Sequence, residues 1–497
     1  MNYRFVFHTI GKVLKVEGVM LLFPLIVAFF YAGTDGFWPV IALSITMAIA
    51  FILGYAFTLI FKPKNQYSFA KEGLITVALA WITVSLIGAL PFVITGEIPN
   101  YIDALFETVS GFTTTGASII PNVELLSHGS LFWRSFTHWI GGMGVLVFVL
   151  AFARKNQDRS IHILRAEMPG PIVDKLVPKA RDTAIILYVI YIVLTLILTI
   201  MLLFGGMSVF ESLIHAFGAA GTGGFGIKLD SIASYNAYCQ WVIAIFMLIF
   251  GVNFNLYFLI IIGKIGTALK SSEFWAYIGI FLLAVTIICI DIYKQIGNFS
   301  DTVRLSFFQA SSIMTTTGYV TTDFDLWPSL SKSVLLILMF IGASAGSTAG
   351  GVKVGRVVIL FKIIANNLKK VLHPRTTTIV KFEGKVLDDE TLKAVTSYLA
   401  IYIFIIVAVF LLLSADPNVS NMLNSVGGNA NAIETNFSAT MACMNNIGPA
   451  FSGAGPMLNY RGYGYFSKIV LTISMLIGRL EIYPILLTFN VFTWVKK

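Results

Sequence analysis

Four short segments of the sequence end in similar tetrapeptides, and each lies between two long apolar stretches. The tetrapeptides are Thr113–Gly116, Ala220–Gly223, Thr315–Gly318 and Asn445–Gly448. Glycine adopts backbone angles that are closed to other residues. Backbone carbonyls can replace the water around a small monovalent cation without binding it too tightly. The four segments therefore predict four equivalent hairpins around a common axis, which line a pore with backbone oxygen.

The residues expected to bind the ion are the last three of each tetrapeptide. They are Thr114, Thr115, Gly116, Gly221, Thr222, Gly223, Thr316, Thr317, Gly318, Asn446, Ile447 and Gly448. For one segment alone, close packing of helices through small residues would be the simpler explanation. Four glycines at matching positions favour the pore.

The elements that must position these segments are membrane-spanning helices. Of the 497 residues, 57% are hydrophobic and 12% charged, whereas ordinary globular chains are about 25% charged. A spanning helix needs about 20 mostly apolar residues. We therefore expect an all-α polytopic membrane protein with ten transmembrane helices, at about 17–32, 38–61, 72–95, 131–153, 183–205, 239–263, 274–294, 333–365, 391–414 and 464–494.

Between the paired members of the last eight spans lie apolar segments that are too short to cross a bilayer. They cover about 102–112, 209–219, 304–314 and 433–444, and as helices they would be about 16–18 Å long. We expect each to enter and leave on one side, with the negative end of its dipole favouring a cation. The predicted units are an amino-terminal helix hairpin at 1–66 and pore repeats at 67–160, 161–265, 266–372 and 373–497.

The distribution of charge predicts the orientation of the chain. Most of the 34 Lys and Arg residues fall in loops on one side of the predicted spans, and such loops are cytoplasmic. Both termini are then cytoplasmic and the tetrapeptides face outward. The net charge of +9 reflects this topology and not a nucleic-acid partner. Acids on the outer side could raise the local cation concentration: Asp103, Glu107, Glu211, Asp230, Asp301, Asp323, Asp325 and Glu434.

The stretch Gly342–Gly351 has four glycines and no large side chain. Because glycine costs about 1 kcal/mol relative to alanine inside a helix, this part of the span at 333–365 should not be stiff. A tight helix crossing is the alternative. Arg479 lies inside the last span, where a charge normally faces a cavity or a partner.

Other functional classes find little support in the sequence. The three cysteines and six histidines have no metal-ligand spacing, and we find no nucleophile or metal cluster of an enzyme and expect no cofactor. No phosphate-cradling loop follows a strand, so nucleotide control would need a partner. A potassium symporter coupled to protons or sodium stays an alternative. Proton coupling usually uses a chain of intramembrane carboxylates, and Glu481 is the main deep acid that the sequence offers.

Several of these motifs together resemble the TrkH/KtrB superfamily of potassium-uptake proteins. The four tetrapeptides with their flanking residues resemble its four filter segments. Further matches are Trp139–Gly144, Ala345–Gly351 followed by Lys353, and Gly478–Ile482. The two extra amino-terminal spans favour the TrkH branch. The resemblance implies a channel-like pore with a selectivity filter that passes K⁺, in a bacterial cytoplasmic (inner) membrane.

The resemblance also implies a gate, a partner and an oligomer. The gate residues would be Gly346, Ser347, Thr348, Gly350, Gly351, Lys353 and Arg479. Arg479 would form part of the barrier, anchor loop carbonyls, or both. A cytosolic TrkA-like nucleotide-binding regulatory subunit would dock on loops 154–182 and 366–393, and the chain would form a homodimer. Gly116 favours potassium over sodium, while the departures at Ala220, Gly221, Asn445 and Asn446 leave the degree of selectivity open.

Overall fold

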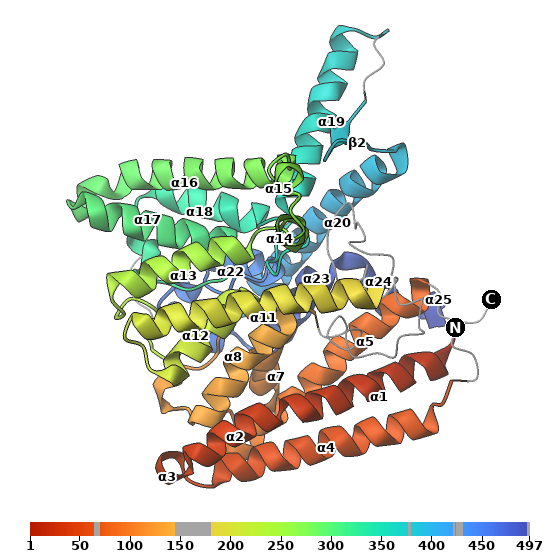
Figure 1. Ribbon diagram of the computed structural model, residues 1–497, viewed down its shortest axis with the longest axis vertical. Coiled ribbons are helices and arrows are strands. Elements are labelled where there is room, and N and C mark those ends of the chain that lie inside the picture. Colours follow the sequence, from red (N-terminus) through yellow and green to blue (C-terminus); the bar gives the residue numbers. More distant parts are fainter. Residues whose placement is uncertain (64–69, 145–179, 376–378, 421–422, 424–430, 495–497) are drawn as a thin grey trace.

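The computed structural model describes the chain except for residues 64–69, 145–179, 376–378, 421–422, 424–430 and 495–497 (Figure 1). The described part is mostly helical. Its strands β1 (Lys381–Phe382) and β2 (Lys385–Val386) form one small antiparallel hairpin. The second half of the span expected at 131–153, and most of the loop expected to dock a partner at 154–182, lie outside the described residues.

Six helical segments in the described part are long and apolar enough to cross a membrane. They are Tyr3–Phe30, made of α1 (Tyr3–Met20) and α2 (Leu22–Phe30); α4 (Trp38–Ile60); Lys71–Thr95, made of α5 (Ala70–Gly88) and α6 (Leu90–Thr95); Asp182–Phe204 within α11 (Ala180–Phe204); α16 (Ser272–Ile296); and α20 (Asp389–Ser414). They carry large apolar side chains on their outer faces, such as Ile52, Leu283 and Phe404. The chain is therefore a polytopic helical membrane protein.

Three other expected spans are interrupted. The pair α13 (Ala237–Phe250) and α14 (Phe254–Ile261) is bent by 89°. The stretch expected at 333–365 is two helices, α18 (Ser329–Ile341) and α19 (Val354–Leu372), joined by a non-helical glycine-rich loop. The last stretch breaks at Glu481, whose φ is +58°, into α23 (Tyr465–Leu480) and α24 (Ile482–Phe489), before α25 (Val491–Trp494). These three stretches are not single continuous helices.

Four short helices lie where the sequence placed its half-length segments: α7 (Tyr101–Phe112), α12 (Val209–Gly221), α17 (Phe299–Met314) and α22 (Ala432–Met444). Each begins after a residue whose side chain caps the helix: Asn100, Ser208, Asn298 and Asn431. An acid stands three residues after each cap: Asp103, Glu211, Asp301 and Glu434. Side-chain caps and acids both stabilise a helix amino terminus. The same starting signal therefore occurs four times.

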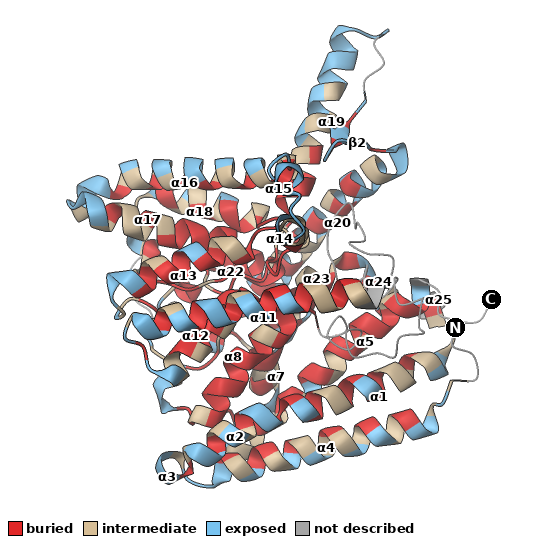
Figure 2. Ribbon diagram, viewed as in Figure 1, coloured by how far each residue is buried: buried red, intermediate tan, exposed pale blue. Residues whose placement is uncertain are grey.

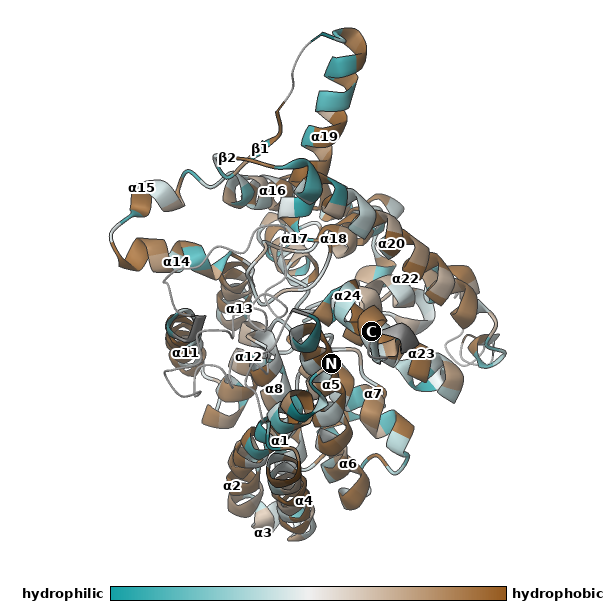
Figure 3. Cartoon of the chain, turned by 90° about the vertical axis from the view of Figure 1, so that its right-hand side faces the viewer, coloured by the Kyte–Doolittle hydropathy of each residue, from teal (hydrophilic) through white to brown (hydrophobic). Residues whose placement is uncertain are grey.

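The short helices form the interior of the molecule and the long helices surround them. Together with α8 (His128–Gly142), they are largely buried, whereas α4, α16 and α19 expose much of their surface (Figure 2). The remaining elements are α3 (Ala32–Asp35), α15 (Ile265–Ala268) and the 3₁₀ turns Val123–Leu125, Phe324–Leu326, Ser452–Ala454 and Tyr460–Gly462. Apolar residues predominate in the helices around the centre, while α19 projects from the body with polar and apolar residues mixed (Figure 3).

Candidate functional site

The four short helices end in the same backbone turn. A non-glycine residue in the left-handed region follows each helix: Thr114, Thr222, Thr316 and Asn446, with φ between +55° and +57°. The amide of the next residue then donates to the carbonyl five positions earlier, as from Thr115 to Ser110 (2.9 Å) and from Ile447 to Ala442 (2.9 Å). This bonding satisfies carbonyls that the helix leaves unpaired.

The turn geometry corrects the register of the second segment by one residue. Thr222, Gly223 and Gly224 correspond to Thr114, Thr115 and Gly116, and Gly224 has the positive φ (+78°) of the closing glycines Gly116, Gly318 and Gly448. Gly221 is the last residue of α12 and corresponds to Thr113. The predicted set Gly221, Thr222, Gly223 was therefore displaced by one position. Because Gly223 and Gly224 are adjacent, the sequence alone allows either one to be aligned with the closing glycines.

The four segments contact one another in a closed ring. A Cβ added to Gly116 would overlap the carbonyl of Gly223, one on Gly224 that of Thr317, and one on Gly318 that of Ile447. The ring closes at Gly448, where an added Cβ would lie 2.6 Å from the Thr115 oxygen. Each closing glycine is therefore packed against a backbone carbonyl of the next segment. No side chain fits at these positions.

Side chains behind the ring hold neighbouring segments together. Nδ1 of His138, on α8, lies 2.7 Å from the carbonyl oxygen of Gly111. Its Nε2 accepts a hydrogen bond from the amide of Phe225 at 3.2 Å. The two bonds require a neutral ring with its proton on Nδ1. Asn446 Nδ2 donates to Thr115 Oγ1 (2.9 Å). Because these bonds cross between segments, they hold neighbouring segments against one another.

A buried ion pair supports the outer side of the first segment. Arg134 Nε donates to Glu107 Oε1 at 2.6 Å, and the two side chains are at most 4% exposed. The other oxygen of Glu107 accepts from the amide of Ile119 at 2.9 Å. Arg134 also donates to the carbonyl of Gly226 (3.1 Å) and stacks on the Phe225 ring. The pair therefore joins the chain after the first tetrapeptide to the chain after the second.

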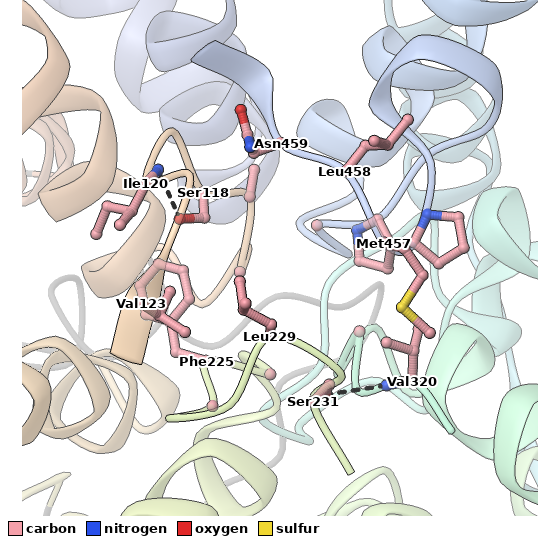
Figure 4. A pocket seen from close by; sticks show the side chains of 18 of the residues that line it. Ser118, Ile120, Val123, Phe225, Leu229, Ser231, Val320, Met457, Leu458 and Asn459 are labelled. Atoms are coloured by element: carbon pink, nitrogen blue, oxygen red, sulfur yellow. Dashed lines mark hydrogen bonds between the residues drawn. The ribbon is translucent and has the colours of Figure 1, made fainter. Parts of the chain in front are cut away.

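A cavity of about 120 Å³ opens on one side of the ring, and all four closing glycines line it. Its walls come from all four segments, with Ser118, Leu229, Val320 and Met457 around the opening (Figure 4). The hydroxyl of Tyr460, another lining residue, donates to the carbonyl of Gly448 at 2.7 Å. The cavity therefore gives access to the ring from one side.

None of the expected outer acids is among the described residues that line this cavity. The charged residues among those described are Arg134 and Lys228. Several of the acids pair elsewhere: Asp103 with Lys468 (2.7 Å), Asp301 with Arg304 (2.7 Å), and both Asp325 (2.6 Å) and Glu434 (2.8 Å) with Lys332. These acids therefore take part in ion pairs between and within elements, and a negative vestibule stays a prediction.

The non-helical loop between α18 and α19, residues Gly342–Lys353, lies against the opposite side of the ring, and we call it the gate loop. The amide of Gly350 donates to Thr316 Oγ1 at 2.7 Å. The α-carbon of Gly350 is so close to the carbonyl of Asn445 that no Cβ would fit. The gate loop is thus in direct contact with the third and fourth ring segments.

The predicted gate residues lie in or against this loop. Arg479 on α23 donates to the carbonyl of Thr348 in the gate loop and to those of Gly141 and Gly142 at the end of α8, each at 2.6 Å. Arg479 therefore anchors loop carbonyls, one of the two roles considered for it. Lys353 is buried, with its ammonium on the carbonyl of Ala349.

The other predicted residues shape the loop itself. Ser347 Oγ donates to Ser344 O (2.7 Å), the carbonyl of Gly346 accepts from the amide of Phe254 (3.1 Å), and Gly351 packs on Gly342 with φ of +79°. Glu481 pairs with Arg356 at 2.5 Å. Sequence reasoning did not find the ion pair of Glu107 with Arg134 or the contacts of His138 and Tyr460, because the pattern within one helix does not show which elements pack together.

Comparison with known proteins identifies the family. The TrkH family model, described as cation transport protein, matches residues 41–282 and 257–493. The chain belongs to the TrkH family. The sequence resemblance is thereby confirmed, and the chain is a transport protein rather than an enzyme.

Relatives of this TrkH-family chain match it over nearly its full length. The Trk system potassium uptake protein TrkH of Escherichia coli K12 is 30% identical, covering 99% of this chain and 100% of the relative. TrkG of the same strain is 32% identical over 99% of both. The crystal structure of the potassium transporter TrkH from Vibrio parahaemolyticus superposes with a TM-score of 0.85 at 30% identity, covering 100% of each chain.

Proposed function

We propose that this protein takes up K⁺ across the bacterial cytoplasmic membrane through a gated, channel-like pore. The closed ring of the four segments carries the proposal. At its centre, backbone carbonyls replace the water around a dehydrated ion. The short helices end at the ring, and their negative dipole ends favour a cation there. The residues of the ring are Thr114–Gly116, Thr222–Gly224, Thr316–Gly318 and Asn446–Gly448.

The same proposal assigns the topology. Ten transmembrane helices cross the bilayer, and α7, α12, α17 and α22 enter and leave from the outside. Interrupted spans are permitted where the irregular backbone lines a cavity instead of facing lipid. The units remain the hairpin at 1–66 and the four pore repeats at 67–160, 161–265, 266–372 and 373–497, with both termini cytoplasmic. The fourfold recurrence of cap, short helix and left-handed turn supports this division.

Potassium is proposed as the transported ion on two grounds. The relatives from Escherichia coli and Vibrio parahaemolyticus carry potassium uptake or transport in their names. In addition, all four closing positions of the ring are glycine, so every position can present its carbonyls without a side chain in the way. The pore is proposed to select K⁺ over Na⁺, and the ion is the cargo of the protein.

The gate loop, packed against the inner side of the ring, is proposed to obstruct the path in this conformation. Opening then requires the loop to break the hydrogen bond from Gly350 to Thr316 and the bond that Arg479 donates to the carbonyl of Thr348. This is a local rearrangement of a few residues. Regulation is proposed to come from a cytosolic TrkA-like nucleotide-binding subunit, and the protein is proposed to act as a homodimer.

Rubidium flux tests the proposal. The purified protein in vesicles should take up rubidium down an imposed potential, and excess sodium should compete poorly. Rubidium uptake that does not depend on the imposed potential, or sodium uptake equal to rubidium uptake, contradicts a selective channel-like pore. The alternative is symport with protons or sodium, and it predicts flux driven by an imposed pH or sodium gradient while the voltage is clamped.

A further inference from the structure

One buried acid that the sequence reasoning did not single out joins the gate loop to the first turn of α19. Glu273 lies near the amino terminus of α16 and is 4% exposed. Its Oε1 accepts from the amide of Ala345 at 2.7 Å and from that of Gly355 at 3.0 Å. Glu273 therefore ties Ala345, inside the gate loop, to Gly355 in the first turn of α19.

Glu273 is itself held by a residue outside the bundle. Glu383 lies in the turn of the β1–β2 hairpin and is exposed. Its Oε1 accepts from the amide of Glu273 (2.8 Å) and from the hydroxyls of Ser272 (2.9 Å) and Ser271 (3.2 Å). The hairpin thus supplies a carboxylate to the unpaired amino-terminal groups of α16, a position where negative charge is favourable.

A second contact joins the hairpin to the start of α19, directly after the gate loop, and it is apolar. Phe382 is 3% exposed and packs with Ile359 on α19 and Val395 on α20. A Cβ added to Gly355 would lie 3.2 Å from the Phe382 ring and 2.9 Å from Glu273 Oε1. Gly355 is therefore enclosed by the hairpin on one side and by Glu273 on the other. In Figures 1 and 3 the hairpin lies where α19 leaves the body of the protein.

These contacts join an exposed surface feature to the ion path. They run from Glu383 to Glu273, from Glu273 to Ala345 in the gate loop, and from Gly350 in the loop to Thr316 in the ring. If the gate loop moves away, Glu273 loses the amide of Ala345. A buried polar group that loses a hydrogen-bond partner is costly. The structure thus couples the position of the loop to the hairpin.

We propose that the β1–β2 hairpin is a latch that keeps the gate loop closed, with Glu273 as the positioning residue between them. The inference rests on the proposed function, because it assigns a regulatory element to the proposed pore. It requires neither nucleotide nor partner: displacing the hairpin is enough to weaken the hold on the loop.

The first measurement is rubidium flux through the full-length protein in vesicles, with Glu383→Ala, Glu273→Gln and Glu273→Ala. Glu383→Ala and Glu273→Ala should raise the flux about tenfold, since each removes hydrogen bonds from the chain of contacts that holds the loop. Glu273→Gln should give a smaller rise, because its amide oxygen can still accept. Selectivity over sodium should not change, since the ring is intact. Glu390→Gln, an exposed acid in the first turn of α20, is the matched control and should behave as wild type.

The second measurement does not depend on transport. Hydrogen–deuterium exchange of peptides covering residues 343–355 should be faster in Glu383→Ala and Glu273→Ala than in Glu390→Gln, with exchange in the middle of α16 unchanged. If exchange in the gate loop is unchanged in these variants, the latch proposal is wrong, whatever the rubidium flux. Faster exchange without a rise in selective flux also overturns it. If the wild type shows no selective rubidium flux under any condition, the proposed function fails, and the exchange experiment still decides whether the hairpin holds the loop.

Discussion

Replacing Gly448 with alanine tests whether the ring selects the ion. The new Cβ would lie 2.6 Å from the Thr115 oxygen and 2.8 Å from the Gly116 carbonyl carbon. Real Cβ atoms essentially never approach closer than 3.0 Å, so the first segment must move by at least about 0.4 Å. Crowding of this kind costs about 1–3 kcal/mol. Because the obstructing atoms are backbone atoms of the ring, the displacement must widen or skew it.

The substitution also introduces backbone strain, which a matched control separates from crowding. Gly448 has φ of +94°, and Gly206 has φ of +88° with nothing within 4 Å of an added Cβ. Alanine in the left-handed region costs about 1–2 kcal/mol at either site. Both variants should therefore lose some thermal stability, but only Gly448→Ala should alter conduction.

In vesicles, Gly448→Ala should lower rubidium flux about tenfold, the equivalent of about 1.4 kcal/mol, and should reduce discrimination against sodium. Gly206→Ala should retain both. Equal flux and equal selectivity in the two variants would refute the assignment of the ring as the selective element.

Three further predictions follow from the same geometry. Arg479→Gln should increase rubidium flux through the protein without a partner, because it weakens the hold on Thr348 of the gate loop; flux at or below the wild-type level contradicts this. Arg134→Met should destabilise the protein by about 3–5 kcal/mol in a denaturation assay, because it leaves buried Glu107 without its ion-pair partner, and a loss below about 1 kcal/mol would argue against the pair. Burial opposes ionisation of Asp416, but hydrogen bonds from Ser467, Asn418 and Gly464 hold the pKa of its carboxyl below the ordinary value. Its stabilising contribution should therefore be present at neutral pH and be lost below about pH 4, and the melting temperature of Asp416→Asn should fall less steeply with acidification than that of the wild type.

Local sequence patterns were sufficient for the long helices and for the position of the ring segments. Apolar runs of about 20 residues predict spans because the bilayer thickness sets a minimum length, and six of the expected spans are long apolar helices in the structure. The closing glycines at 116, 318 and 448 were recognisable because few other residues tolerate a positive φ. The repeated starting signal of a cap and an acid was present in the sequence too, although the acids were first interpreted as a vestibule.

Only the tertiary structure decided which residue closes the second segment and what each buried charge contacts. Gly223 and Gly224 satisfy the same local rule in the sequence, and the folded turn distinguishes them: Gly224 has the positive φ and packs against Thr317 from another segment. Glu383 and Glu273 are 110 positions apart, and Arg479 reaches carbonyls 131 and 338 positions away. Contacts over such separations depend on how helices pack against one another, and the periodicity of a single helix does not encode them.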